Sequence, residues 1–191
     1  WMKKSVDLSK YHEKRERTIR FYERTLTKQF KDDYKASINY LNNLRKIANM
    51  VIRNKTVPLA QDQFSKFLHD LITQLADEKA FYSRPFDELF PYLFCLEEQY
   101  ITSHNIQDSD GLRFINILEL YFEIATLYFF NDLDKKMTIY LFANKFIPLM
   151  KEYDVEIMCQ YFNKICPNST WNYLWQLYLG FQNGPHSMTH N

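Results

Sequence analysis

Glycine and proline are scarce in this chain, which has three glycines and six prolines among 191 residues. Phosphate-binding loops such as G-x-G-x-x-G and the Walker motif need glycines at short, fixed spacings. Gly111, Gly180 and Gly184 match neither spacing, so we expect no nucleotide site. The same scarcity leaves few positions for tight β-turns and favours helices joined by short polar connections.

The chain also lacks the histidine and cysteine motifs of metal sites. H-E-x-x-H, C-x-x-C and the E-x-x-H of di-iron bundles are absent, and the five histidines occur singly. We therefore expect no metal, no cofactor and no enzymatic activity. Cys95, Cys159 and Cys166 lie among apolar residues, which is typical of reduced, buried thiols and favours an intracellular protein, cytoplasmic or nuclear.

An apolar signal sequence is missing from the N-terminal residues, which are mostly polar and charged. The most apolar segment, Leu112–Phe130, contains Glu119 and Glu123 near its middle. Each of these glutamates would cost about 2.5 to 3.5 kcal/mol at the centre of a bilayer. We therefore expect no transmembrane helix.

Residues 112–130 are instead predicted to form a buried helix around which the other helices pack. The few polar residues of this segment recur at steps of three and four, so they form one narrow stripe on an otherwise apolar helix. The stripe consists of Arg113, Asn116, Glu119, Glu123 and Thr126. In its structural interpretation, the stripe is simply the solvent-exposed side of the helix, or its glutamates pair with Arg113 and with a lysine of a neighbouring helix. In its functional interpretation, Asn116, Glu119 and Glu123 line a groove for a cationic or amide-bearing partner.

Residues 1–57 contain no glycine or proline and are predicted to form a long, basic, amphipathic helical arm. Asp32 or Asp33 could cap a second helix that continues to about Asn54, so the pattern leaves one helix or two open. The apolar face is expected to contain Leu8, Ile19, Tyr22, Leu26 and Phe30. The opposite face carries Lys10, Arg17, Arg20, Arg24, Lys28, Lys31 and Lys35.

Prolines and polar segments divide the rest of the chain into shorter predicted helices. We expect a turn over residues 86–90, and we expect the polar segment Asn105–Asp110 to cap the buried helix that follows it. Two of the other expected helices cover residues 60–79 and 91–104. A third begins near Met137 and ends or kinks at Pro148, and a fourth runs from Val155 to Pro167 with Asp154 as its cap. The last begins at Asn168 or Ser169 and ends just before Gly180.

Together these elements predict an all-α protein, either an irregular multi-helix bundle or a short α-solenoid of about seven helices built from αα-hairpins. Residues 1–181 are expected to form one helical domain, with the arm at 1–57 and an aromatic-rich core at 58–181. Residues 182–191 are predicted to be a disordered tail. The pattern does not say whether the chain is part of a longer protein.

Aromatic residues are abundant, with 33 in the chain and 24 of them between Phe81 and Phe181. A small helical domain has difficulty burying so many rings, and exposed Tyr and Trp are well suited to anchoring a partner. We expect Trp171, Trp175 and Tyr178 to contribute to such a surface. The leading hypothesis is a non-enzymatic protein-protein interaction module, such as an adaptor, scaffold or regulatory subunit. Its partner would be a peptide, a helix, a partner subunit or a second copy of the chain.

The arm suggests an alternative, which is binding of nucleic acid or an anionic membrane. Residues 1–35 hold 11 Lys or Arg against 6 Asp or Glu, although the whole chain carries a net charge of only +1. A polyanion would contact Arg17, Arg20, Arg24, Lys28 and Lys31, with Phe21 on the same side. Glutamates flank this stripe, so an ordinary solvated face is the competing interpretation.

Overall fold

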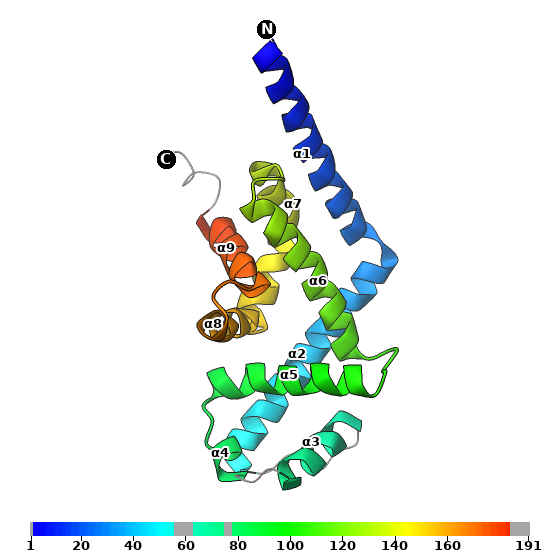
Figure 1. The fold of residues 1–191 in the computed structure, drawn as a ribbon. Coiled ribbons are helices and arrows are strands. Elements are labelled where there is room, and N and C mark those ends of the chain that lie inside the picture. Colours follow the sequence, from blue (N-terminus) through cyan, green and yellow to red (C-terminus); the bar gives the residue numbers. More distant parts are fainter. Residues whose placement is uncertain (1, 56–62, 75–77, 184–191) are drawn as a thin grey trace. The chain divides into compact units, whose positions relative to one another are not determined.

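A computed structural model describes residues 2–55, 63–74 and 78–183. These residues form nine helices and no strands, which confirms the predicted all-α class (Figure 1). The helices are α1 Met2–Leu26, α2 Lys28–Asn54, α3 Gln63–Gln74, α4 Glu78–Tyr82, α5 Phe86–Ser103, α6 Asp110–Phe129, α7 Lys135–Glu152, α8 Val155–Ile165 and α9 Thr170–Asn183.

The chain divides into two compact units. The first unit combines Trp1–Tyr34 with Asn116–Asn191, and the second unit is Lys35–Ile115. The first unit therefore contains α1, α7, α8 and α9 and most of α6. The second contains most of α2, all of α3, α4 and α5, and the first turns of α6.

The N-terminal arm is two helices, and their boundary lies earlier than Asp32 or Asp33. The break occurs at Thr27, whose side-chain oxygen accepts a hydrogen bond from the N–H of Phe30 at 3.1 Å. A threonine in this position satisfies one of the amide groups that every helix start leaves without a partner. Asp33 is buried within α2 instead, where the side chain of Gln29 donates a hydrogen bond to it.

The apolar face expected for the arm is right only in part. Phe30 is buried and Tyr22 is half-buried, as expected, but Leu8, Ile19 and Leu26 are exposed, whereas Thr18 and Phe21 are buried. A hydrogen bond of the buried Thr18 hydroxyl explains why a different face of α1 points inward. The Thr18 side chain accepts this hydrogen bond from the N–H of Asp134, just before α7, at 3.0 Å. The same hydroxyl donates to the carbonyl oxygen of Lys14. Such a specific polar contact can outweigh the position of the largest apolar side chains.

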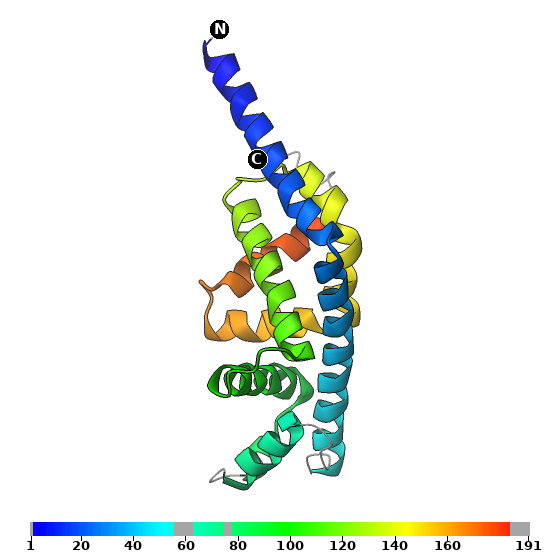
Figure 2. The same ribbon diagram turned by 90° about the vertical axis from the view of Figure 1, so that its right-hand side faces the viewer.

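Rings from α6, α7 and α9 form the centre of the first unit. Phe146 lies between Tyr121 and Phe181, with ring centroids 4.7 Å and 5.4 Å away, and all three rings are buried. Figure 2 shows α7 returning in the opposite direction to α6 after a short connection. The start of α2 contacts α7 through the Tyr34 hydroxyl, which donates to the carbonyl oxygen of Lys145 at 2.8 Å. Much of the predicted aromatic surplus is therefore core.

α5 contradicts the turn predicted over residues 86–90. Pro85 is the N-cap, and Pro91 lies inside one continuous helix. A proline in a helix interior costs about 3 kcal/mol or more. Burying a large apolar side chain contributes about 1.5 to 3 kcal/mol, and this stretch buries Leu89, Phe90, Leu93 and Phe94. Several buried side chains therefore offset one interrupted hydrogen bond.

Two other predicted helix ends also differ. α7 does not end at Pro148 but continues to Glu152, again with buried residues, Leu149 and Met150, beyond the proline, and the alternative of a kink there stays a prediction. α9 continues through Gly180, which serves close packing and not termination. A methyl group at Gly180 would lie 2.8 Å from the hydroxyl oxygen of Tyr128 on α6.

The remaining boundaries agree with the pattern except where residues are not described. The predicted helix at 60–79 corresponds to α3 and the start of α4, and residues 60–62 and 75–77 lie outside the described part. α5 ends next to His104, and Ser109 caps α6 by accepting a hydrogen bond from the N–H of Leu112. Asp154 directly precedes α8, as expected, but its backbone is left-handed and its side chain makes no capping hydrogen bond. Of the predicted tail, residues 182 and 183 end α9 and the rest is not described.

The contact between Thr18 and Asp134 can be tested by Thr18→Val, which keeps the side-chain shape and removes the acceptor. The N–H of Asp134 would lose its partner next to the buried Thr18 side chain, so the free energy of unfolding should fall by about 1 to 3 kcal/mol. Urea denaturation followed by circular dichroism measures this change. Thr126→Val is the matched control, because its hydroxyl bonds only to the preceding turn of α6, and it should shift stability by less than about 0.5 kcal/mol. Equal effects would contradict the proposed anchor.

Candidate functional site

Exposed rings gather where α6 ends. Phe129 and Phe130 are 48% and 59% exposed, and their ring centroids lie 4.7 Å and 5.7 Å from that of Tyr173 on α9. Asn131 adopts a left-handed conformation with a φ of 59°. Its N–H and that of Asp132 donate to carbonyls of the last helical turn, which is a Schellman motif. This motif ends α6 at a point where two consecutive phenylalanine side chains are exposed.

A hollow borders these rings in the first unit. Its volume is about 470 Å³, and Lys135 lies at its edge with the ammonium nitrogen 5.3 Å from the centre of the Tyr128 ring. The lining residues are Tyr128, Phe129, Lys135, Gln176, Leu179, Gly180 and Asn183. Phe129, Phe130, Tyr173 and this hollow are called the aromatic surface below.

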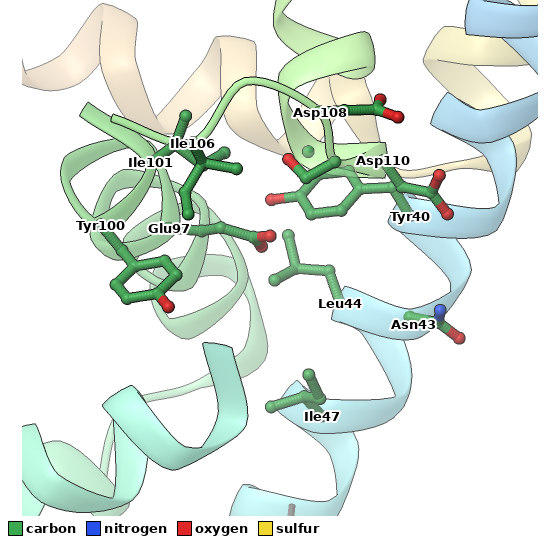
Figure 3. A pocket seen from close by; sticks show the side chains of 12 residues that line it. Tyr40, Asn43, Leu44, Ile47, Glu97, Tyr100, Ile101, Ile106, Asp108 and Asp110 are labelled. Atoms are coloured by element: carbon green, nitrogen blue, oxygen red, sulfur yellow. The ribbon is translucent and has the colours of Figure 1, made fainter. Parts of the chain in front are cut away.

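A second candidate site lies entirely within the second unit. The C-terminal end of α5 forms one of its walls. Asn105 is left-handed, with a φ of 50°. The N–H of Ile106 donates to the carbonyl oxygen of Ile101 at 3.0 Å, and the N–H of Asn105 donates to that of Thr102. This second Schellman motif folds Ile106 back toward Ile101, so both side chains form one wall of a pocket (Figure 3).

α2 and the start of α6 complete this pocket, which has a volume of about 360 Å³. Helical spacing aligns the α2 residues along one face, and the same spacing aligns Glu97, Tyr100 and Ile101 on α5. The lining residues are Tyr40, Asn43, Leu44, Ile47, Glu97, Tyr100, Ile101, Ile106, Asp108, Ser109, Asp110 and Gly111. This cavity is called the acidic pocket below, because three of its residues are carboxylates and none is Lys or Arg.

Gly111 allows the Glu97 carboxylate to lie against the first turn of α6. A methyl group at Gly111 would be 2.8 Å from Oε1 of Glu97 and 3.1 Å from Cδ1 of Ile101. Only a residue without a side chain leaves that space for the carboxylate. Figure 3 shows the Glu97 side chain directed toward Tyr40 and Leu44.

Tyr40 supplies the most unusual polar group of the acidic pocket. The residue is 5% exposed, and its hydroxyl lies next to the Glu97 carboxylate. Burial, followed by the negative charge of Glu97 and a hydrogen bond to that side chain, raises the pKa of the Tyr40 hydroxyl well above its ordinary value.

The acidic pocket places carboxylates beside apolar walls. Among the described residues there is no group of three or more His, Cys, Asp or Glu side chains arranged to hold a metal. Asp108 also forms an ion pair with Arg113, with Nε and Oδ1 3.0 Å apart. The apolar walls, formed by Leu44, Ile101 and their neighbours, would accept the hydrocarbon part of a ligand.

The polar stripe of α6 lies at the surface. Asn116, Glu119 and Glu123 are exposed, and Glu123 accepts a hydrogen bond from Arg24 of α1 at 2.7 Å. Arg113, at the start of the stripe, forms an ion pair with Asp108. Both side chains of the Arg24–Glu123 pair are 53% exposed, so its contribution to stability is small, about 0 to 1 kcal/mol. A role of this stripe in partner binding stays a prediction.

The three predicted aromatic anchors of α9 lie in different environments. Tyr178 is buried, and its hydroxyl donates to Glu156 at 3.0 Å, so it has no free surface to offer. Trp171 is half-buried and stacks on Phe162, with ring centroids 4.6 Å apart. Trp175 is half-buried and contacts the Tyr178 ring. Among the described residues, the exposed rings are Tyr11 on α1, Phe129 and Phe130 at the end of α6, and Tyr140 on α7.

The five basic residues proposed for polyanion binding are exposed but divided between two helices. Arg17, Arg20 and Arg24 belong to α1, whereas Lys28 and Lys31 follow the break at Thr27. Arg20 pairs with Glu16, and Arg24 pairs with Glu123. Phe21, expected beside them at the surface, is buried with the Arg24 guanidinium 5.2 Å from its ring centre.

Sequence reasoning missed both Tyr40 and Glu97, which are 57 positions apart. One usable signal was Gly111, one of only three glycines, placed at the beginning of an apolar helix. A glycine there has no terminating role, so it indicates a close approach by another group.

Comparisons with known proteins identify no relationship. No protein-family model, curated protein or solved structure matches the chain. Within the described residues, no helix is long and apolar enough to cross a membrane. The functional inference therefore depends on the geometry of the chain itself.

The packing beneath the aromatic surface can be tested by Gly180→Ala. Alanine favours helix by about 1 kcal/mol over glycine, but its methyl group would clash with the buried Tyr128 hydroxyl, and overpacking typically costs about 1 to 3 kcal/mol. We therefore expect lower stability in urea denaturation. In a Tyr128→Phe background the clashing oxygen is gone, so the same substitution should raise stability by up to about 1 kcal/mol. Destabilisation of equal size in both backgrounds would contradict this packing.

Proposed function

We propose that the chain is a non-enzymatic helical module that binds a protein partner through the aromatic surface. The observation that carries this proposal is the exposure of Phe129 and Phe130 beside a hollow in the first unit. Exposed apolar residues that occur singly need no explanation, but adjacent aromatic rings around a concave surface are typical of interaction sites. The partner would be a peptide, a helix, a partner subunit or a second copy of the chain.

The composition of the aromatic surface supports this proposal. Aromatic residues are enriched in protein interfaces because they bury a large area and lose little conformational freedom. Lys135 and Gln176 provide polar groups at the edge of the hollow, as in the polar rim of many interfaces. An adaptor, scaffold or regulatory subunit would use such a surface without any catalytic group.

The double substitution Phe129→Ser and Phe130→Ser should abolish capture of the partner. Hot-spot aromatic residues commonly contribute 2 kcal/mol or more to binding, so losing two should weaken affinity by about 100-fold or more. The measurement is affinity capture from the native host by wild-type and variant chains, followed by quantitative mass spectrometry. If the partner is a second copy, sedimentation should show a dimer that the double variant does not form.

Tyr140→Ser is the matched control for this experiment. Tyr140 is 84% exposed, belongs to the same unit and does not line the hollow. It should retain every protein that the wild type retains, and circular dichroism should confirm that all chains are folded. A partner lost equally by Tyr140→Ser and by the double variant would contradict a role specific to the aromatic surface.

The competing polyanion hypothesis is tested best through Arg17 and Arg20. Arg24 is unsuitable because Arg24→Glu would face Glu123 and uncover Phe21, which would disturb the packing of α1. We expect the wild type to show no appreciable affinity for duplex DNA or acidic vesicles at physiological salt. Binding that weakens sharply between about 50 and 200 mM salt, and that is lost in Arg17→Glu with Arg20→Glu, would favour the polyanion hypothesis instead.

A further inference from the structure

α1 has two faces, and one of them packs on the first unit. The packed face contains Thr18, Phe21 and Thr25, which are buried. The other face carries a row of large side chains at steps of three and four, so they line up along the helix. Four of these side chains are apolar and remain between 38% and 60% exposed. The row, called the α1 stripe below, consists of Leu8, Tyr11, Arg15, Ile19, Tyr22 and Leu26.

The N-terminal part of α1 is exposed on almost all sides. Every side chain from Leu8 to Arg17 is exposed except Lys14, which is half-buried. Figures 1 and 2 show the beginning of α1 reaching past the other helices of the first unit. A helical segment without tertiary packing is only marginally stable in water. An apolar stripe that continues onto such a segment is therefore suited to pairing with another helix.

We propose that the α1 stripe pairs with the α1 stripe of a second copy of this chain, in antiparallel orientation and with the two-fold axis near Arg17. In such a pair, residues at equal distances before and after Arg17 meet. Leu8 lies nine positions before Arg17 and Leu26 nine positions after it, so Leu8 contacts Leu26 of the second copy. Arg15 and Ile19 lie two positions on either side, so the apolar stem of Arg15 covers Ile19 of the second copy.

The residues beside this apolar seam are matched in the same register. Tyr11 lies six positions before the two-fold axis and Tyr22 five positions after it, so their rings meet between the two copies. His12 and Glu23 lie five positions before and six positions after the axis, on the other side of the stripe, and both are exposed. The His12 ring can therefore donate a hydrogen bond to the Glu23 carboxylate of the second copy.

Charge complementarity selects a second copy in antiparallel orientation. Glu16 and Arg20 form an exposed ion pair within one α1, with the two charged groups 3.7 Å apart. Both lie close to the two-fold axis, so the Glu16 of each copy also meets the Arg20 of the other. A parallel pair would instead place Arg15 against Arg15 and Glu23 against Glu23, and such contacts between like charges are unfavourable. A stripe that complements its own reverse needs no other partner.

Analytical ultracentrifugation of the full chain tests the pairing. We expect a reversible dimer within a concentration range of about 1 to 500 µM, which spans the affinities of small interfaces. The double substitution Leu8→Ser and Ile19→Ser should raise the dissociation constant at least about tenfold, because both apolar contacts of the seam are lost. A chain that stays monomeric at every concentration would overturn the proposal.

Ile165→Ser is the matched control for this experiment. Ile165 belongs to the same unit, ends α8 and is 64% exposed, so its substitution removes a comparable apolar side chain outside α1. It should change the dissociation constant by less than about twofold. Circular dichroism should show that all these chains remain folded, since every substituted residue is exposed. Equal weakening by Ile165→Ser and by the double variant would overturn the role of the α1 stripe.

Charge reversal tests the contacts near the two-fold axis without removing any apolar side chain. Glu16→Arg places like charges at both Glu16–Arg20 contacts of its dimer, and Arg20→Glu does the same with the opposite sign. Each variant alone should therefore dimerise more weakly than the wild type. An equimolar mixture of the two should form the heterodimer at least several-fold more tightly than either homodimer. A mixture that dimerises no better than its components would overturn this register.

Disulfide formation tests the orientation. Cys166→Ser provides the background, because it removes the exposed cysteine of the described residues. In this background, Leu8→Cys and Leu26→Cys chains should cross-link to each other rapidly when they are mixed and oxidised, because antiparallel pairing brings these two positions together. Leu8→Cys chains alone should cross-link at least about tenfold more slowly. Preferential cross-linking of Leu8→Cys chains to one another would overturn the antiparallel arrangement.

The aromatic surface provides the last control, because this inference does not depend on it. Phe129→Ser with Phe130→Ser leaves α1 unchanged, so that variant should dimerise as the wild type does. A dimer that is lost in this variant but retained by Leu8→Ser with Ile19→Ser would be formed by the aromatic surface, and it would overturn pairing through α1. The reverse result supports pairing through α1 and leaves the capture of another partner by the aromatic surface to its own test.

Discussion

Left-handed asparagines set the geometry on which both candidate sites depend. Asn105 ends α5 and Asn131 ends α6, each through a Schellman motif in which amides of the next residues bond back to the last helical turn. Glycine usually occupies this position because it has no Cβ to clash, and asparagine is the common substitute. The chain has three glycines, and within the described residues none of them follows the last turn of a helix, so asparagine provides these reversals. One reversal exposes Phe129 and Phe130, and the other folds Ile106 over the acidic pocket.

How much of the fold was predictable depends on whether the controlling interaction was local. The helical period and a cap within Asn105–Asp110 are properties of neighbouring residues, so the sequence predicted them, and a solvated stripe on α6 was one of its interpretations. The rotation of α1 depends on the bond between Thr18 and the N–H of Asp134, which are 116 positions apart. The continuation of α5 through Pro91 depends on burial that a local pattern does not contain. Local rules therefore located the helices but misplaced several of their ends and one face.

The candidate sites were harder to predict for a related reason. A count of aromatic residues indicated that some rings would be exposed, but it favoured Trp171, Trp175 and Tyr178 over Phe129 and Phe130. Tyr178 is buried, and its hydroxyl donates a hydrogen bond to Glu156. The packing of α8 on α9 brings this partner into place. Glu97 attracted no notice because its environment is created by residues of α2 and by Gly111. Such sites are products of tertiary contacts, and their residue types are ordinary.

Two buried tyrosines show how the surroundings of a ring decide what its hydroxyl can contact. Burial raises the pKa of both Tyr40 and Tyr121. Tyr121 lies at the centre of the first unit, where its ring packs on Phe146 and its hydroxyl has no hydrogen-bond partner among the described residues. That unsatisfied hydroxyl is a cost of placing a large ring in an apolar core. Tyr40 lies instead at the wall of the acidic pocket, where the Glu97 carboxylate is close enough to raise its pKa further.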